Sequence, residues 1–425
     1  MKPRIFACFF SLLLIALVAA CAPVPVPPAS PTASAPDATQ TAFIPTSTPP
    51  AITATLATES SPPVEISPTP TASQTSSQQF LAYVQDGQLL VSDVTGGVLG
   101  GTTQYTMTGE SDQVSDIAWS PSGEFVAFTS SAKGDPHVFY IFALGESSPT
   151  DLGPGSAPTW SPDSQSIAYI GGTYPDNNIW VTTIENPVPR QLTSETNYAW
   201  GNPVFTPDGQ SLILAGTDRN NMGAQGNTTF TLESLALDGS GTRTPLPGAT
   251  PFEGGRLPYD LKFSPDGTKL AFSTSFHLSA CASPGAYYVS NADGGNRQEL
   301  VSPYLKPTID SAKEHYHVGL SYDWNASSNA LVALGNVVDC DISSPTNGQV
   351  LAGPQLSVIG LDGSEGLIIP GFFYGISVDR TGTMIAAAHF QNGFQDLNPV
   401  VEIYSAQNGQ LMLSLGPGSD PNFQP

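Results

Sequence analysis

The chain has 425 residues, 13 lysines and arginines against 36 aspartates and glutamates, and a formal net charge of −23. So few cations disfavour a nucleic-acid binder, which needs a basic surface to neutralise phosphates. The 41 glycines and 40 prolines disfavour a coiled coil or a helical bundle. The composition therefore predicts a turn-rich, all-β chain that is long enough to bury a large core.

The first 21 residues have the layout of a bacterial lipoprotein signal peptide. Lys2 and Arg4 are followed by an apolar stretch over residues 5–18, which is short for a membrane-spanning helix. The next residues complete the sequence Val18-Ala19-Ala20-Cys21, which resembles a lipobox. We therefore expect palmitate and related acyl chains on Cys21, which would hold the mature protein at the membrane. An ordinary cleaved signal peptide or an uncleaved anchor is the alternative.

Residues 22–79 differ sharply in composition from the rest of the chain. They are mostly Pro, Ser, Thr and Ala, and their only charged residues are Asp37, Glu59 and Glu65. Such a segment buries too little apolar surface to offset the entropy of the chain, so we expect it to be disordered. We interpret it as a tether between the lipid anchor and a folded head.

One short pattern recurs in the remaining residues. An aromatic residue ends a strand, a turn of the type Ser/Thr-Pro-Ser/Asp-Gly/Ser follows, and a short apolar strand comes next. In such a turn proline presets φ, aspartate bonds the local backbone, and glycine accepts a positive φ. The clear copies begin at Trp119, Trp160, Phe205 and Phe263. We expect four strands in each unit, A to D, with this turn between A and B.

Two eroded copies lie near Tyr322 and Val378, and the two ends of the folded part supply one more. Residues 420–425 match strand A with half of the turn, and residues 80–83 match the strand that follows it. Seven units over residues 80–425 average about 49 residues, against about 40–50 in known propeller repeats. We therefore predict an all-β fold: a seven-bladed β-propeller whose first blade is completed by the C-terminal strand.

These repeats resemble those of the TolB-like, WD-repeat-like β-propeller family. The resemblance covers essentially all of residues 80–425 and implies a ring of blades around a central channel. The A–B turns would then lie at one mouth of the channel and the starts of the A strands at the other. The resemblance is weak for function, because this fold hosts scaffolds, receptors and enzymes.

The residues just before strand A predict a binding rim at the second mouth. Several units offer aromatic or histidine side chains there, whereas the other units offer serine. Exposed aromatic residues beside a cavity are typical of binding sites, and inward packing of the rings is the alternative. The candidate rim residues are Trp200, Tyr259, His277, His315, His317, Phe373, Tyr374 and His389.

All five histidines fall on this predicted face, since His137 joins the four already named. Imidazole and carboxylate ligands suit several divalent metals, but none of the spacings is diagnostic. His315 and His317 are two residues apart and would point to opposite sides of a strand. We therefore predict no metal site, no cofactor and no catalytic residue.

Cys281 and Cys340 are the only cysteines beyond Cys21. An even number of cysteines in an oxidising compartment favours a disulfide between them. Two independent buried thiols are the alternative.

These features together predict a membrane-tethered, extracytoplasmic lipoprotein that is not an enzyme. Its propeller would bind or scaffold an unknown envelope protein or glycan, and no nucleic acid. The alternative is an extracytoplasmic polysaccharide-degrading lyase or hydrolase with a metal at the channel mouth. The resemblance leaves this open, because some relatives of this propeller family are oligogalacturonate lyases. No nucleophile elbow or phosphate-binding loop is present in the sequence.

Overall fold

The structure is a computed structural model that describes residues 78–105, 114–133, 135–142, 145, 148–221, 230–251, 257–274, 286–393 and 398–425. The chain divides into two compact units, residues 1–67 and 68–425, and every described residue belongs to the second. The predicted signal peptide, Cys21 and almost all of the predicted linker therefore lie outside the described residues. Within the described part, no helix is long and apolar enough to span a membrane.

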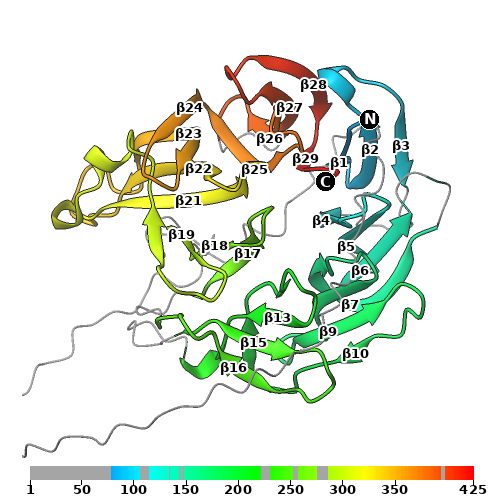
Figure 1. The fold of residues 1–425 in the computed structure, drawn as a ribbon. Coiled ribbons are helices and arrows are strands. Elements are labelled where there is room, and N and C mark those ends of the chain that lie inside the picture. Colours follow the sequence, from blue (N-terminus) through cyan, green and yellow to red (C-terminus); the bar gives the residue numbers. More distant parts are fainter. Residues whose placement is uncertain are drawn as a thin grey trace, which may run out of the picture. The chain divides into compact units, whose positions relative to one another are not determined.

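The regular structure of the described residues is almost entirely β (Figure 1). The strands of the first half of the second unit, together with the C-terminal strand β29, form one four-stranded, one seven-stranded and one two-stranded sheet. These strands are β29 (Ser419–Phe423), β1 (Phe80–Gln85), β2 (Gln88–Asp93) and β3 (Thr102–Tyr105); then β4 (Val114–Trp119), β5 (Phe125–Lys133), β6 (Asp135–Phe142), β7 (Thr150–Trp160), β8 (Ser166–Gly171), β9 (Asn178–Thr183) and β10 (Arg190–Gln191); and then β11 (Tyr198–Trp200) with β14 (Gly216–Asp218).

The second half forms four more sheets, each of four antiparallel strands. Their strands are β12 (Val204–Phe205), β13 (Ser211–Leu214), β15 (Glu233–Ala236) and β16 (Arg243–Pro245); β17 (Tyr259–Phe263), β18 (Lys269–Ser273), β19 (Tyr287–Asn291) and β20 (Gln298–Leu300); β21 (His315–Trp324), β22 (Ala330–Asp339), β23 (Val350–Gly360) and β24 (Glu365–Pro370); and β25 (Phe372–Val378), β26 (Met384–Phe390), β27 (Val400–Ser405) and β28 (Leu411–Pro417). Short 3₁₀ turns connect some of them: η1 (Thr95–Gly97), η2 (Arg219–Asn221), η3 (Lys306–Thr308) and η4 (Ser311–Lys313).

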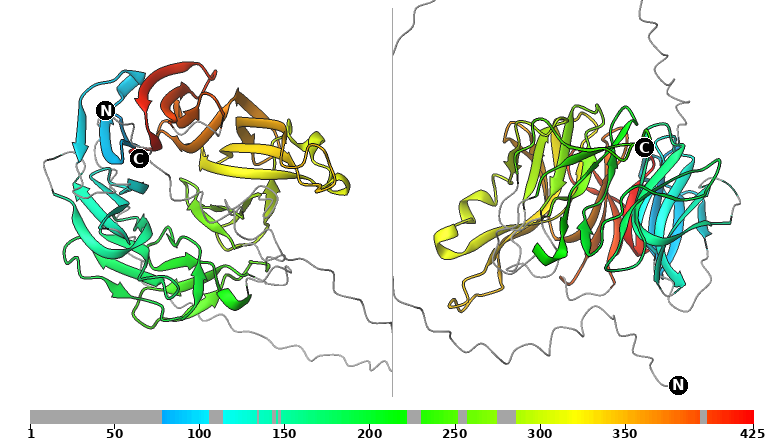
Figure 2. Two further views of the ribbon diagram at one scale, coloured as in Figure 1. Left: turned by 180° about the vertical axis from the view of Figure 1, so that it is seen from behind. Right: turned by 90° about the horizontal axis from the view of Figure 1, so that it is seen from below.

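The all-β propeller fold predicted from the repeats is confirmed. The sheets stand side by side around a common axis, with strands such as β4, β17, β25 and β29 innermost (Figures 1 and 2). The long strand β7 is the outer strand of one group of four over residues 150–154, where it pairs with β6, and the inner strand of the next over residues 155–160, where it pairs with β8. We interpret the arrangement as seven units of four strands, with β11 and β14 as an extension of the fourth. The number seven stays a prediction.

The C-terminal strand completes the first sheet, as predicted. β29 pairs antiparallel with β1, so that Phe423 lies opposite Leu81 and Asn422 opposite Ala82. Two hydrogen bonds extend this pairing: the backbone N–H of Gln424 donates to Phe80 over 2.9 Å, and the side chain of Gln79 donates to the carbonyl of Gln424 over 2.8 Å. The two ends of the described chain therefore share one sheet, and β29 covers the edge of β1 that would otherwise be unpaired.

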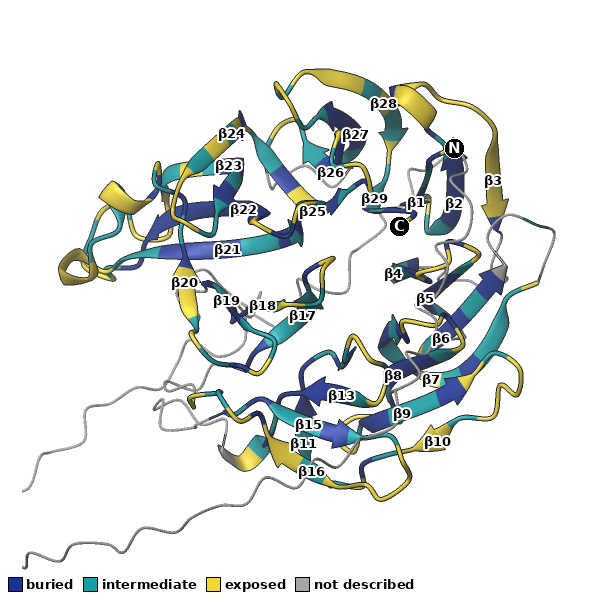
Figure 3. Ribbon diagram, viewed as in Figure 1, coloured by how far each residue is buried: buried dark blue, intermediate teal, exposed yellow. Residues whose placement is uncertain are grey.

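The core lies between neighbouring sheets and is built by the apolar strand of each repeat. Val126, Ala127 and Phe128 are fully buried, as are the equivalent residues of the other repeats. Figure 3 shows that the second strands are mostly buried, whereas outer strands such as β3, β10 and β16 are mostly exposed. Burial is thus greatest at the second strand of each sheet and lower both at innermost strands such as β17 and at the outer strands.

Where the aromatic residue of a repeat is tryptophan, it also links its sheet to the preceding one. The indole N–H of Trp160 donates to the carbonyl of Ala118 over 2.9 Å, and that of Trp324 to Lys262 over 3.1 Å. The indole of Trp119 makes the same bond across the closure, to Asn422, over 2.9 Å. The repeat therefore encodes a contact between successive sheets as well as a turn.

Candidate functional site

Two cavities lie along the central axis, one at each end of the inner strands. The cavity at the strand starts, which we call the strand-start cavity, has a volume of about 330 Å³. The cavity beside the A–B turns, which we call the turn-end cavity, has a volume of about 770 Å³. Lys262, Ile376 and Asn422 line both cavities, so the two meet inside the channel.

Three aspartates from three different sheets line the strand-start cavity: Asp116, Asp260 and Asp420. Each one has a left-handed backbone, with φ of 50°, 53° and 49°. Each also lies where the pairing of its inner strand shifts by a β-bulge. Aspartate tolerates this conformation better than most residues, and a bulge redirects a side chain. The bulges thereby bring the three carboxyl groups to one end of the channel.

The electrostatics of this cavity follow from burial and from the crowding of like charges. Burial, with the nearby charge of Asp116, raises the pKa of Asp420 to about 6. The charge of Asp420, with burial and the charge of Asp116, raises the pKa of Tyr374 well above its usual range. The cavity is therefore acidic at neutral pH, and the hydroxyl of Tyr374 keeps its proton.

Lys262 is the cation between the two cavities, and its ammonium group is held by neighbouring sheets. Its Nζ donates to the carbonyl of Tyr322 over 2.9 Å and lies 3.8 Å from Asp260 and 3.9 Å from Asp323. Burial favours the neutral amine, but the carboxylates of Asp260 and Asp323 outweigh it and raise the pKa of Lys262. Lys262 therefore stays charged and offsets part of the acidity of the channel.

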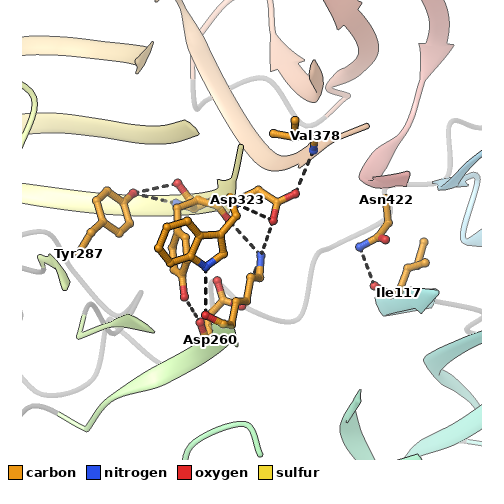
Figure 4. A network of polar contacts seen from close by, with 10 residues as sticks. Ile117, Asp260, Tyr287, Asp323, Val378 and Asn422 are labelled. Atoms are coloured by element: carbon orange, nitrogen blue, oxygen red, sulfur yellow. Dashed lines mark hydrogen bonds and ion pairs between the residues drawn. The ribbon is translucent and has the colours of Figure 1, made fainter. Parts of the chain in front are cut away.

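Asp323 extends this network to the next sheet (Figure 4). One of its oxygens accepts the backbone N–H of Val378 over 2.9 Å. The hydroxyl of Tyr322 donates to the carbonyl of Asp260, and the hydroxyl of Tyr287 accepts from the backbone N–H of Ser321 over 3.1 Å. Burial raises the pKa of Asp323 despite its proximity to Lys262. Three consecutive sheets are thus fixed relative to one another beside the cavity.

Two of the predicted rim residues do line the strand-start cavity. They are Tyr259 and Tyr374, and the side chain of Tyr374 is 43% exposed. His315 is half-buried at the start of β21, opposite Asp339. His277 lies outside the described residues.

Trp200 and Phe373 do not form an exposed rim, which corrects the prediction for these residues. Trp200 is 8% exposed and Phe373 is 1% exposed, and both pack in the core. The reason is the alternation of side chains along a strand: Phe373 and Tyr374 are adjacent and point to opposite faces. A shift of one residue in the expected strand moves a side chain from the channel into the core.

The histidines are dispersed over several sheets. His317, another predicted rim residue, is buried with its ring edge-on to Tyr287, so the prediction of an exposed rim is wrong for it as well. The Nδ1 of His389 lies 2.8 Å from Glu402, and the Nδ1 of His137 lies 3.0 Å from Asp151. Within the described ranges, no group of three or more His, Cys, Asp or Glu side chains is placed to hold a metal ion.

Cys340 is disulfide-bonded. It lies directly after β22 and packs against Val318 and Val338. Its predicted partner, Cys281, lies outside the described residues. The pairing of Cys281 with Cys340 therefore stays a prediction.

The channel aspartates were missed by sequence reasoning, although the repeat contains a signal for them. Each lies three residues before the aromatic position of its repeat, namely before Trp119, Phe263 and Phe423. The residues that occupy this position in the four other repeats are Ala157, Asn202, Ser321 and Gly375. All seven except Ala157 line the strand-start cavity. Alignment of the repeats on their aromatic residues would have identified this repeat position.

Comparison with known proteins supports the fold. The family model described as "WD domain, G-beta repeat" matches residues 101–138. No curated protein matches the sequence. The predicted resemblance to TolB-like, WD-repeat-like β-propellers is confirmed.

Several solved structures are similar at low sequence identity. The periplasmic gluconolactonase of Pseudomonas aeruginosa has a TM-score of 0.53 and 15% identity, over 82% of this chain and 99% of that chain. The oligogalacturonate lyase of Vibrio parahaemolyticus has a TM-score of 0.51 and 11% identity, over 80% and 85%. TolB from Acinetobacter baumannii has a TM-score of 0.45 and 14% identity, over 82% and 67%. The gluconolactonase and the lyase, with TM-scores above 0.5, share the fold alone with this chain, since their sequence identities are below 25%.

Proposed function

We propose that this protein is an extracytoplasmic binding module, tethered to the membrane by a lipid on Cys21, and that it is not an enzyme. The signal sequence and the lipobox support the location and the anchor. The observation that carries the binding role is the strand-start cavity, where Tyr259 and Tyr374 stand beside three aspartates from different sheets. An aromatic pocket with convergent polar groups is a typical binding site.

The chemistry of this cavity favours a partner with a cationic group. Ionised carboxylates attract an ammonium or guanidinium group, and the two tyrosine rings supply apolar area around it. Asp260 is held by Lys262, and Asp116 accepts hydrogen bonds from the hydroxyl of Thr129 over 2.8 Å and from the backbone N–H of Ala157 over 3.2 Å. The cavity is therefore preformed, which lowers the entropic cost of binding. An envelope protein that presents a lysine or arginine side chain fits this description.

The experiment uses the full chain, expressed in its native envelope and crosslinked before isolation. We expect a specific partner whose capture falls at least tenfold in Tyr374→Ala, because this half-exposed ring lines the cavity. Ile342→Ala is the matched control, since Ile342 is 92% exposed and does not line the cavity. Equal capture by both variants would contradict the proposed site. Incorporation of labelled palmitate, lost in Cys21→Ala, tests the anchor.

An extracytoplasmic lyase or hydrolase with a metal at the channel mouth is the second candidate. Two of the proteins that share the fold are named as enzymes, a lactonase and a lyase. His389 and its partner Glu402 are the residues that favour this reading, because a carboxylate that fixes one imidazole nitrogen leaves the other free for a ligand. Elemental analysis of the purified protein separates the candidates. A stoichiometric transition metal that is lost in His389→Ala would favour the enzyme.

A further inference from the structure

The turn-end cavity is walled by one repeat position, two residues after the aromatic residue. Proline occupies this position in five repeats, and all of these prolines are exposed. The residues at this position are Pro121, Pro162, Pro207, Pro265, Ala326, Arg380 and Pro425, and every one of them lines the cavity. Five of these seven residues are prolines, which have no backbone N–H, and Ala326 is also apolar, so the ring is mostly apolar and Arg380 is its one charged side chain.

A third cavity, with a volume of about 720 Å³, continues from this ring between two neighbouring sheets. It shares Pro162, Phe205 and Pro207 with the turn-end cavity. From there it runs over β9 to Val188, whose side chain is 68% exposed. We call the two connected cavities the turn-face groove. The turn chemistry explains the prolines, but it does not explain an exposed valine at the far end of the groove.

Acidic side chains flank the middle of the turn-face groove. Asp163 and Asp208 both line it, and both are exposed. Hydrogen bonds from the hydroxyl of Thr206 and the backbone of Gln210 lower the pKa of Asp208. The other charged residues that line the groove are Arg190, Lys262, Asp266, Asp323, Asp379 and Arg380. The groove therefore carries both signs of charge, with more carboxylates than cations.

We propose that the turn-face groove binds an extended peptide segment of a protein partner, in which an aromatic residue is followed closely by lysine or arginine. The aromatic ring fills the proline-lined cavity, because flat rings pack well against apolar rings and act as anchors in pockets. The cation lies beside Asp163 and Asp208, where charges are complementary. The remaining segment runs outward over Val188. This surface is at the opposite end of the channel from the proposed binding cavity and does not depend on it.

The test selects ligands for the immobilised full chain from a random dodecapeptide library displayed on phage. We expect enrichment of peptides with Trp, Tyr or Phe within three positions of Lys or Arg. The most enriched sequence is then synthesised, and its affinity is measured by fluorescence anisotropy with the wild type and the variants. The absence of enrichment over the bare support, or enrichment without the aromatic-basic pair, would overturn the proposal.

Two matched variants place the peptide on the groove. Val188→Glu puts a charge on an exposed groove residue, and we expect it to weaken binding of the synthetic peptide at least tenfold. Ile342→Glu makes the same change at an exposed residue elsewhere, and we expect unchanged binding. Equal affinities for the two variants would overturn the proposal. If Val188→Glu instead converted a dimer to a monomer in sedimentation velocity, a second copy of the chain would be the occupant and the peptide assignment would be wrong.

Discussion

The two ends of the central channel are built from the same repeats but differ in regularity. At the turn end, the aromatic residue and the proline recur in most repeats, and the resulting side chains are nearly uniform. At the strand-start end, the position three residues before the aromatic residue varies among Asp, Asn, Ser, Gly and Ala. The recurring aromatic and proline positions maintain the ring, whereas the position three residues before the aromatic residue differs among repeats and can form a specific site.

The contrast has a physical cause in the hydrogen bonds of each end. The turn residues are bound by their own backbone geometry: the N–H of Gly123 donates to Ser120 over 2.8 Å, and the indole of Trp160 reaches the preceding sheet. At the strand starts, the bulges remove residues such as Asp116 from the ladder. The side chain of Asp116 instead accepts the hydroxyl of Thr129 over 2.8 Å and the backbone N–H of Ala157 over 3.2 Å. The bonds at the strand starts therefore depend on which side chain is present, whereas the turn of each repeat is held by its own backbone.

The largest expected effect comes from removal of the closure that both ends share. Deletion of residues 419–425 removes β29, its pairing with β1 and the acceptor of the Trp119 indole. We expect the melting temperature to fall by more than about 10 °C, since a few kcal/mol shifts it by several degrees in a domain of this size. Replacement of the same residues by Gly and Ser is the control for chain length and should be equally damaging. An unchanged melting curve would contradict the closure.

A charge change at each end should alter stability in opposite directions. The raised pKa of Asp420 means that the unfolded state loses its proton first, so stability falls as pH rises from about 4 to 6. We expect Asp420→Asn to stabilise the protein above pH 6 by about 2 kcal/mol, reduced from the full linkage value by partial exposure, and to have no effect below pH 4. Asparagine also tolerates the left-handed backbone at this position.

Asp208 at the turn end is the matched comparison for Asp420. Its pKa is lowered by the hydroxyl of Thr206, so its contribution to stability is present at neutral pH and is lost as pH falls through the folded-state pKa. Asp208→Asn should therefore destabilise the protein at pH 7. Urea unfolding of both variants at pH 4 and pH 7 gives the free energies. If Asp420→Asn and Asp208→Asn changed the free energy of unfolding in the same direction at pH 7, the environments assigned to Asp420 and Asp208 would be wrong.

A smaller effect is expected from a change within the regular end. Trp160→Phe keeps an aromatic ring in the turn-end wall but removes the indole donor to Ala118. In the next repeat the equivalent residue is Phe205, so a phenyl ring fits this position of the repeat. We expect a loss of about 1–2 kcal/mol in the free energy of unfolding, the worth of one hydrogen bond whose partner stays buried. Phe205→Leu serves as the control for a change without a lost donor.

The strand-start end shows why sequence reasoning found only part of the candidate site. Tyr259 and Tyr374 were identified because they lie at the right distance before strand A and face the channel. Trp200 was misassigned because a shift of one residue turns its side chain into the core, where it is 8% exposed. The β-bulges set this register, and no residue type in the sequence marks a bulge uniquely.

The sequence by itself determined the all-β repeat, the turn chemistry and the closure by the last strand, because each depends on residues a few positions apart or on matching ends. Only the tertiary structure decided which side chains share the channel. Asp116, Asp260 and Asp420 are far apart along the chain and come together because their sheets surround one axis. The turn-face groove likewise exists only where neighbouring sheets meet. Contacts of this kind depend on the angle and spacing between sheets, which no local pattern of residues specifies.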